Sequence, residues 1–397
     1  MLNGWLAGLA VLALTLSPAG PGKATAQQLY DQGTAALLAE RPEQARAWYA
    51  RACAAGHVTG CYDLGVFAEN GTGGATDEAA ARGHYDTACT GGEMMACSNL
   101  AMMLEDGRGG SVEAPRARTL YELACEQGRM EACSNLAAML NEGKGGPADA
   151  ERAMALNDRA CTAGNTTACS NLAGGWENDS TDPQQLARAR AIYRALCDGG
   201  DTNGCLRLGY MLEEPQGGPA DHGAALRLFE RSCAAGLGAG CNAAGVSHAK
   251  GKAGPVDDIQ ARVYYELACE RGRPAGCGNW GALLENGRGG AEDKPAARQL
   301  YERACAAGWA KSCSNLADMM LLGEGGPVMI AAARQHLRPA CADNLPAACL
   351  KLGTLLADGR GGPKDEAEAR ALFRKACDLK LAVACDFANG NMRPPGP

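Results

Sequence analysis

The chain has 397 residues, 46% of them apolar but only 5% aromatic, with a formal net charge of −7. This acidic balance argues against a nucleic-acid partner, because nucleic-acid-binding proteins present a basic face. All 20 cysteines fall into pairs at one fixed period, so the sequence predicts copies of one small unit instead of two or three unrelated domains.

The chain begins with an apolar stretch that predicts an export signal. Residues 2–16 are almost all apolar, and Ala24-Thr25-Ala26 offers a small-x-small cleavage site before Gln27. The stretch has about 15 residues, fewer than the ~20 that a membrane-spanning helix needs. We therefore expect residues 1–26 to be a cleaved signal peptide, leaving a periplasmic or secreted protein without a stable membrane anchor.

The remaining chain predicts a repeat array over residues 27–390 and a disordered tail at 391–397. Residues 27–40 look like a first helix without a cysteine. In a typical copy, residues 96–131, apolar residues recur at helical spacing at Leu100, Met103 and Leu104. A loop of Gly107-Arg108-Gly109-Gly110 follows, and a second helix is predicted from about residue 114 to 125. We expect the loop arginines Arg108, Arg288 and Arg360 to be solvated.

The residue three places after the first cysteine of each pair marks the end of the second helix. It is glycine in eight copies, and Asn344 and Lys380 in the last two. Glycine and asparagine are preferred where a helix ends in the left-handed conformation. The next helix then starts near the second cysteine, and so short a turn makes the two helices antiparallel neighbours.

The cysteine spacing predicts one disulfide in every copy. First cysteines recur every 36 residues, and the second member of each pair follows eight residues later. An exported chain with evenly spaced, even-numbered cysteines is typical of a disulfide framework. The predicted pairs are Cys53–Cys61, Cys89–Cys97, Cys125–Cys133, Cys161–Cys169, Cys197–Cys205, Cys233–Cys241, Cys269–Cys277, Cys305–Cys313, Cys341–Cys349 and Cys377–Cys385.

Three further periodic positions predict how the copies pack. Small residues stand four places after the second cysteine and directly before it, where we expect helix backbones to approach closely. An aromatic residue stands four places before the first cysteine in most copies, with Asn157 and Leu337 as exceptions. We expect its ring to lie between successive units. Irregular features are an atypical loop at residues 174–183 and possible bends at Pro215 and Pro339.

The copies resemble Sel-one-like repeats in the Leu-Tyr-Glu-x-Ala-Cys segment ending at Cys125, the glycine after it, and Asp-Gly-Arg-Gly-Gly at residues 106–110. With the added cysteine pair, the chain is similar to the Helicobacter-type cysteine-rich protein family, whose relatives include a mitochondrial respiratory-chain assembly factor. The resemblance implies an all-α, right-handed α-solenoid of about ten antiparallel helix pairs, with one disulfide per 36-residue repeat. Some members carry a beta-lactamase or penicillin-binding label and others act through protein contacts, so the resemblance leaves the activity open.

The sequence contains no complete catalytic or metal-binding motif. Ser247 and Lys250 match S-x-x-K, but the S-D-N and K-T-G partners of serine beta-lactamases are missing. The five histidines lack metal-ligand spacing, and every cysteine has a disulfide partner. We therefore predict no catalytic residues, no cofactor and no metal.

A periodic polar position two places after the second cysteine is the candidate ligand groove. Its members are Asp63, Asn99, Asn135, Asn171, Asn279 and Asn315. An asparagine amide can pair with a peptide backbone through both a donor and an acceptor, so a row on the concave face could hold an extended segment. The alternative is that each side chain satisfies local backbone groups at its helix start.

These observations predict an exported, monomeric scaffold that binds another protein or peptide on its concave face. One alternative is a beta-lactamase or penicillin-binding protein. A second is an intermembrane-space assembly factor, if the source is eukaryotic.

Overall fold

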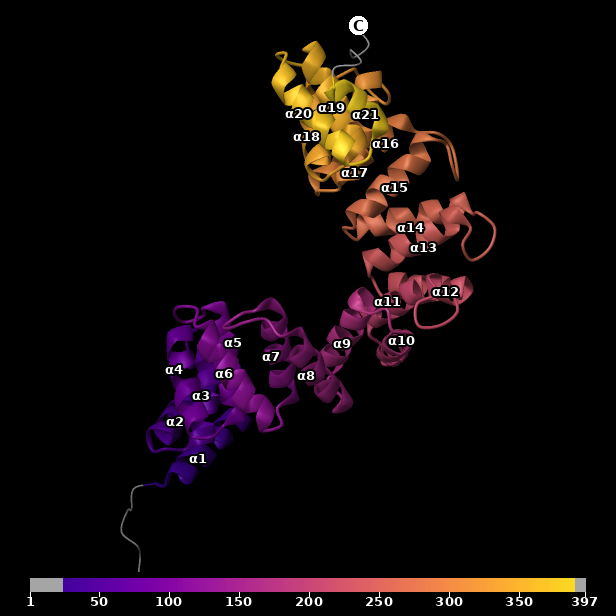
Figure 1. Cartoon of the computed structure of the whole chain (residues 1–397). Helices are drawn as coiled ribbons and strands as arrows, with labels where there is room; N and C mark the ends of the chain where they lie inside the picture. Colours follow the sequence, from indigo (N-terminus) through magenta and orange to yellow (C-terminus); the bar gives the residue numbers. More distant parts are fainter. Residues whose placement is uncertain (1–23, 390–397) are drawn as a thin grey trace, which may run out of the picture. The chain divides into compact units, whose positions relative to one another are not determined.

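The computed structural model describes residues 24–389, and within them α-helix is the only regular secondary structure. The chain divides into two compact units, Met1–Cys169 and Ser170–Pro397, each a stack of helices (Figure 1). The predicted tail at 391–397 and nearly all of the predicted signal peptide lie outside the described residues. Among the helices of residues 24–389, none has the length and apolar character needed to cross a membrane.

The helices of the first unit are α1 (Ala26–Leu38), α2 (Pro42–Ala54), α3 (Val58–Asn70), α4 (Glu78–Thr90), α5 (Met94–Asp106), α6 (Ala114–Glu126), α7 (Met130–Glu142) and α8 (Ala150–Thr162). Helix α9 (Thr166–Asp179) contains the boundary between the units. The second unit continues with α10 (Pro183–Asp198), α11 (Thr202–Glu213), α12 (His222–Ala234), α13 (Gly238–Lys250), α14 (Asp258–Glu270), α15 (Pro274–Glu285), α16 (Lys294–Ala306), α17 (Ala310–Leu322), α18 (Ile330–Ala342), α19 (Pro346–Asp358), α20 (Glu366–Asp378) and α21 (Ala382–Ala388).

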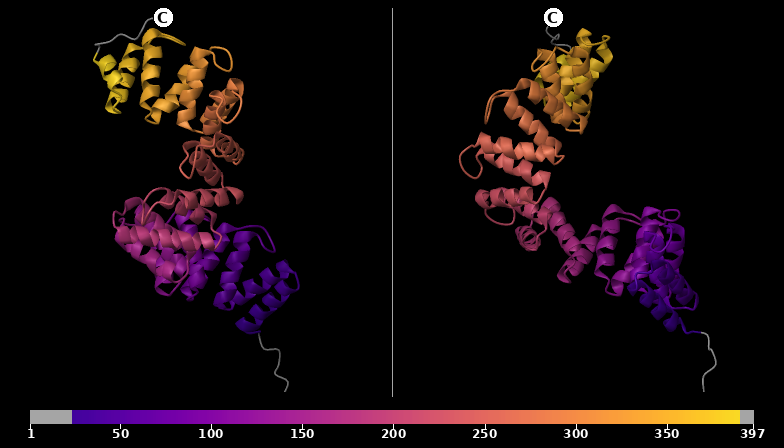
Figure 2. Two further views of the ribbon diagram at one scale, coloured as in Figure 1. Left: turned by 90° about the vertical axis from the view of Figure 1, so that its right-hand side faces the viewer. Right: turned by 180° about the vertical axis from the view of Figure 1, so that it is seen from behind.

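Two kinds of connection alternate along each stack. A longer, glycine-rich loop follows most odd-numbered helices, whereas only three residues follow α1 and α9, and a short turn closed by a disulfide follows each even-numbered helix from α2 onward. Within each unit consecutive helices lie side by side, as the turned views also show (Figure 2). The predicted all-α solenoid with one disulfide per repeat is therefore confirmed.

All ten predicted disulfides are formed, and the described residues contain no free cysteine. The first cysteine lies at the end of an even-numbered helix and the second in the first turns of the next helix. Their Cα atoms are 4.5–4.7 Å apart, within the range that a disulfide can bridge. Each bridge thus clips an even-numbered helix to the odd-numbered helix that follows it.

The predicted left-handed residue ends every disulfide-linked even-numbered helix. The eight glycines of this position have φ between +72° and +96°, and Asn344 and Lys380 have φ of +61° and +70°. Lys380 shows that the turn imposes this conformation even on a residue that disfavours it. The antiparallel arrangement of neighbouring helices follows from this short turn.

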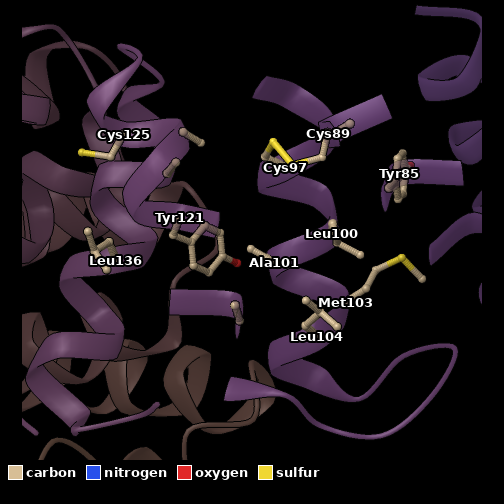
Figure 3. Close-up of a cluster of buried hydrophobic side chains, with 14 of the residues drawn as sticks. Tyr85, Cys89, Cys97, Leu100, Ala101, Met103, Leu104, Tyr121, Cys125 and Leu136 are labelled. Carbon is tan, nitrogen blue, oxygen red and sulfur yellow. A yellow bond between two sulfur atoms is a disulfide. The ribbon is translucent and has the colours of Figure 1, made fainter. Parts of the chain in front are cut away.

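The aromatic position fills the space between consecutive odd-numbered helices, as predicted. Tyr85 and Tyr121 are 0% and 1% exposed, and Figure 3 shows the Tyr121 ring of α6 facing Ala101 of α5. A Cβ atom at Gly65 would lie only 2.7 Å from the Tyr85 ring. The small residue four places after the second cysteine therefore accommodates an aromatic ring, and our expectation of backbone contact at this position was wrong.

The small residue directly before the second cysteine does allow close backbone approach. A Cβ atom at Gly276 would lie 2.5 Å from the Ala268 Cβ and 2.9 Å from the Cys269 backbone nitrogen. At Gly240 the same atom would lie 2.6 Å from the Ser232 Cβ. The two helices joined by a disulfide are therefore in near-contact where the bridge forms.

The glycine-rich loops fasten each helix pair to the pair before it. Gly109 has φ +67°, and a Cβ atom there would overlap the carbonyl group of Glu78 at the start of α4. Arg82 of α4 donates from Nη1 to the Ser111 carbonyl oxygen of the same loop at 2.9 Å. Equivalent arginines in other copies hold their loops in the same way, for example Arg118 on Pro147. Arginine at this position was a periodic signal that our sequence analysis missed.

Substituting Gly109 with alanine tests this loop contact. We expect Gly109→Ala to lower the free energy of unfolding by more than about 2 kcal/mol, because the new methyl group overlaps backbone atoms that cannot move aside. Gly92→Ala is the matched control: Gly92 also has positive φ, but no atom lies within 4 Å of its Cβ position. It should lose only the ~1 kcal/mol of left-handed strain. Equal losses in urea unfolding would contradict the contact.

The atypical copy departs from its prediction as a loop. Helix α9 continues through Gly174 to Asp179, and only three residues separate it from α10. Trp176 is 3% exposed, and the Arg188 guanidinium lies 4.6 Å from the centre of its ring. Trp176 occupies the position of Leu104 in α5, which is also helical and buried, and α9 ends only one residue later than α5, where Asp179 stands in place of Gly107.

The two prolines behave differently from each other. Helix α11 ends at Glu213, two residues before Pro215, whereas Pro339 lies inside α18. Proline cannot donate a backbone hydrogen bond, so the shorter α11 follows from its sequence.

Candidate functional site

The polar row lies in the second turn of odd-numbered helices, two residues after the disulfide. Asp63, Asn99, Asn279 and Asn315 are half-buried, and Asn135 and Asn171 are exposed. Residues at other positions cap the helix starts: Asn165 Oδ1 accepts from Ala168 N at 2.8 Å, and Asp201 Oδ1 from Gly204 N at 2.6 Å. These two helix starts are therefore capped by residues outside the polar row.

Tyrosine hydroxyls of the preceding even-numbered helix lie near several members of the row. The side chain of Asn99 lies near the Tyr85 hydroxyl, and Asn135 and Asn315 lie near those of Tyr121 and Tyr301. An asparagine amide has two N–H groups and a carbonyl oxygen, so it can interact with a tyrosine and with another partner at once.

Asp63 and Asn279, two members of the row, have other polar contacts. Asp63 interacts with the Tyr30 hydroxyl, and burial raises the pKa of its carboxyl. Asn279 Nδ2 donates to Asn242 Oδ1 of α13 at 2.9 Å, which joins two odd-numbered helices directly. The row is interrupted at Arg207, which pairs with Glu177 at 2.6 Å, and at Ala243, which is 4% exposed.

A row of glutamates, which the sequence analysis missed, accepts hydrogen bonds from the same tyrosines. Tyr85 and Tyr301 donate to Glu69 and Glu285 at 2.6 Å, and Tyr193 donates to Glu177 at 3.0 Å. Each glutamate lies on the odd-numbered helix that precedes its tyrosine. A tyrosine thus connects a carboxylate on one odd-numbered helix to the polar row on the next.

Cations from the glycine-rich loops complete these contacts. Arg108 pairs with Glu69 and with Glu78, both at 2.8 Å. Lys144 lies 3.2 Å from Glu105, and Lys252 lies 2.9 Å from Glu213. Glu69 and Glu213 have side chains only 14% and 13% exposed, so these cations neutralise carboxylates that are largely removed from water.

Arg288 makes the same kind of contact in the second unit, where it pairs with Asp258 at 2.5 Å. The expectation that the loop arginines would be solvated holds for Arg360, which is exposed, whereas Arg108 and Arg288, with side chains 31% and 46% exposed, form ion pairs. Their ion pairs connect each loop to the helix pair before it.

Burial raises the pKa of the tyrosines that lie in these contacts. The pKa of Tyr193 rises to about 12 through burial and the nearby Glu177 carboxylate, and that of Tyr265 rises to about 12 mainly through burial. For Tyr85, burial and the hydrogen bond to Glu69 also raise the pKa. In every case the native structure favours the neutral phenol.

Alkaline pH should therefore destabilise the fold. The unfolded tyrosine pKa is about 10, so above that pH the unfolded chain loses protons that the native chain retains. We expect full stability below pH 10 and a steady fall between pH 10 and 12, measured as the urea midpoint at 25 °C. Tyr265→Phe should flatten this fall, because Phe229 and Phe373 occupy the same repeat position without an ionisable group. A pH-independent midpoint would contradict the raised pKa values.

The serine of the S-x-x-K match does not form a catalytic site. Ser247 lies inside α13 and is only 2% exposed, so a substrate cannot reach its hydroxyl. Its neighbour His248 stacks on Tyr264 and lies 3.4 Å from Glu230 Oε1. The element is helical, whereas a nucleophile elbow requires a strand before the serine. In residues 24–389 no group of three or more His, Cys, Asp or Glu side chains is placed to hold a metal ion.

Comparison with known proteins identifies the repeat. The model of the Sel1 repeat matches residues 25–57, 58–93, 95–128, 131–165, 202–237, 238–272, 274–309, 310–345 and 346–381. Residues 166–201, which contain the atypical copy, lie between two of these segments. In a search of curated proteins, no sequence matches the chain.

Solved structures with the same repeat are similar to the chain. One is c5321, a protective antigen of uropathogenic Escherichia coli strains with an SLR fold, at 26% identity and a TM-score of 0.68, covering 91% of this chain and 79% of that one. A Sel1 repeat protein from Oxalobacter formigenes has 19% identity and a TM-score of 0.50, with 94% and 91% covered. Cysteine-rich protein B of Helicobacter pylori has 22% identity and a TM-score of 0.22, with 41% and 91% covered.

Proposed function

The chain belongs to the Sel1 repeat family, and we propose that it is an exported scaffold that binds an extended segment of another protein along the polar row of its odd-numbered helices. Repeats of this kind generally mediate protein–protein interactions. They suit this role because stacked helices present a long, rigid surface that needs little ordering on binding. Ten disulfides are typical of a protein in an oxidising compartment outside the cytoplasm.

The observation that carries this proposal is the position of the row beside buried tyrosines. Asn99 and Asn135 lie in the first unit and Asn315 in the second, each beside a buried tyrosine hydroxyl. An amide whose position is set by such a neighbour loses little side-chain freedom when it binds a peptide. Its carbonyl oxygen and an N–H match the donor and acceptor of one peptide group.

Affinity capture with the oxidised protein tests the row. We expect the chain to retain partners from periplasmic extract or culture medium, and expect loss after Asn99→Ala with Asn135→Ala, or after Asn279→Ala with Asn315→Ala. The matched control replaces two exposed amides on even-numbered helices, Gln299→Ala with Gln335→Ala, and should retain the partner. Capture that survives both asparagine variants would exclude the row as the binding surface.

The location of the mature protein is a separate part of the proposal. The apolar stretch at residues 2–16 and the small residues before Gln27 support export to the periplasm or the medium after removal of residues 1–26. Mass measurement of the protein purified from its native host should give a chain that begins at Gln27. An N-terminus that retains the apolar stretch would contradict cleavage.

A further inference from the structure

The disulfide between Cys305 and Cys313 borders an open cavity of about 340 Å³ at the surface of the second unit. Pro339, Ala342 and Asp343 of the following pair also line it. Cys305 is half-buried, as are Cys53, Cys161, Cys169, Cys377 and Cys385, whereas Cys269 and Cys277 of the preceding bridge are at most 2% exposed. A small reagent can therefore approach the Cys305–Cys313 bridge without unfolding of the helix pair.

The copy that contains this bridge lacks a cation that four other copies use to cover the first cysteine. In those four, Arg159, Arg231, Arg303 and Lys375 donate at 2.8–2.9 Å to the carbonyl oxygens of Cys125, Cys197, Cys269 and Cys341. The copies that begin at Cys53, Cys89, Cys161, Cys233 and Cys305 have no cation at this position. In the last of these the position holds Pro339, which lines the cavity.

A histidine stands next to the same bridge. His336 Nδ1 lies 3.6 Å from Cys305 Sγ, and the equivalent positions in the neighbouring copies hold Leu300 and Leu372. An imidazole at this distance can supply a proton to a thiolate formed at Cys305, or stabilise that thiolate by its charge when protonated. Stabilising the thiolate favours the reduced form of the bridge.

A nearby cation by itself does not make a bridge accessible. Arg271 Nη1 lies 3.2 Å from Cys233 Sγ and 2.8 Å from Cys241 Sγ, but these cysteines are 3% and 0% exposed. The Cys233–Cys241 bridge therefore separates the effect of charge from the effect of access.

We propose that Cys305–Cys313 is a thiol-exchange site, which reacts with a small dithiol while fully buried bridges such as Cys269–Cys277 remain intact. A thiolate of the dithiol attacks Cys305 Sγ, the Cys305–Cys313 bond breaks, and Cys313 leaves as a thiolate that takes up a proton. The second thiolate of the reagent then attacks the reagent sulfur of the mixed disulfide. This closes the oxidised reagent and releases Cys305 as a thiolate, to which His336 passes a proton. Two electrons move from the dithiol to the protein disulfide.

Time-resolved alkylation of the oxidised full-length chain tests this site. The protein is treated with limiting dithiothreitol well below its melting temperature, free thiols are trapped with iodoacetamide, and each cysteine is quantified by peptide mass spectrometry. We expect Cys305 and Cys313 to be labelled at least tenfold faster than Cys269 and Cys277. Equal rates, or faster labelling of Cys233 and Cys241, would overturn the proposal.

Two variants identify the cause of the reactivity. Pro339→Arg introduces the cation that four other copies carry at this position, and it should slow labelling of Cys305 about tenfold by covering the bridge. His336→Leu should lower the equilibrium constant for reduction of this bridge about tenfold, equivalent to ~30 mV. Thermal unfolding of both oxidised variants, followed by circular dichroism, establishes that they fold. If both folded variants react like the wild type, the cavity and the histidine are not responsible and the proposal fails.

Discussion

Reduction of all ten disulfides is expected to abolish the folded array. Each bridge closes a nine-residue loop, and the loss of chain entropy in the unfolded state corresponds to about 2.6 kcal/mol for each one. A typical domain has a net stability of ~5–15 kcal/mol, so the loss of all ten bridges, about 26 kcal/mol, exceeds it. Far-ultraviolet circular dichroism at 25 °C should show the loss of helix after full reduction and alkylation. A reduced protein that keeps its helix content and melts within a few degrees of the oxidised one would contradict this expectation.

Removal of a single disulfide measures its contribution to the free energy of unfolding. Cys125→Ala with Cys133→Ala should lower the free energy of unfolding of the oxidised protein by about 2–4 kcal/mol. Both cysteines are at most 2% exposed, and alanine leaves only a small cavity in their place. In reductant the wild type also lacks this bridge, so the difference between the two proteins should nearly vanish. A difference that persists in reductant would assign the effect to packing.

Truncation of a tyrosine between odd-numbered helices should have the second-largest effect. Tyr121 is 1% exposed, and it separates Ala101 of α5 from the helix that carries Asn135. Tyr121→Ala removes this ring and should lower the free energy of unfolding by about 3–5 kcal/mol. Limited proteolysis should then cleave the first unit before the second, because the cavity lies in the stack that ends at Cys169.

Tyr121→Phe is the matched control for this truncation. It keeps the ring and removes only the hydroxyl, and Glu105 retains Lys144 at 3.2 Å. Phe229 and Phe373 fill the same position in other copies, and they are 0% and 4% exposed. We therefore expect a loss of no more than about 1 kcal/mol. A loss as large as that of the alanine variant would mean that the hydrogen bonds stabilise the stack more than the ring does.

The helix limits could be predicted from the sequence because local chemistry decides them. In residues 96–131, two glycines with positive φ mark the helix ends as predicted. Gly107 caps the end of α5, and Gly128 lies two residues after the last residue of α6. The prediction of a loop failed for residues 174–179, which lie in α9 as residues 102–106 lie in α5, with Trp176 buried at the position of Leu104. That burial depends on packing, which a local pattern does not describe.

The candidate site was only partly predictable. The spacing identified the polar row. It left open whether Asn99 binds a ligand or the backbone at its own helix start, and it did not predict that Asn99 lies near a tyrosine 14 residues earlier. The glutamates and loop cations have the same 36-residue period, so a search for every charged periodic position would have found them. Their pairing across 16 or 39 residues could not be read from that period.

By itself, the sequence determined the repeat, the ten disulfide pairs and the helix ends, because each depends on residues within one turn or one short loop. Only the tertiary structure decided which partner each polar side chain has, and that the Cys305–Cys313 disulfide borders a cavity beside His336. Those contacts join residues about 30 positions apart. They form only when one helix pair packs on the next, so their geometry belongs to the stack.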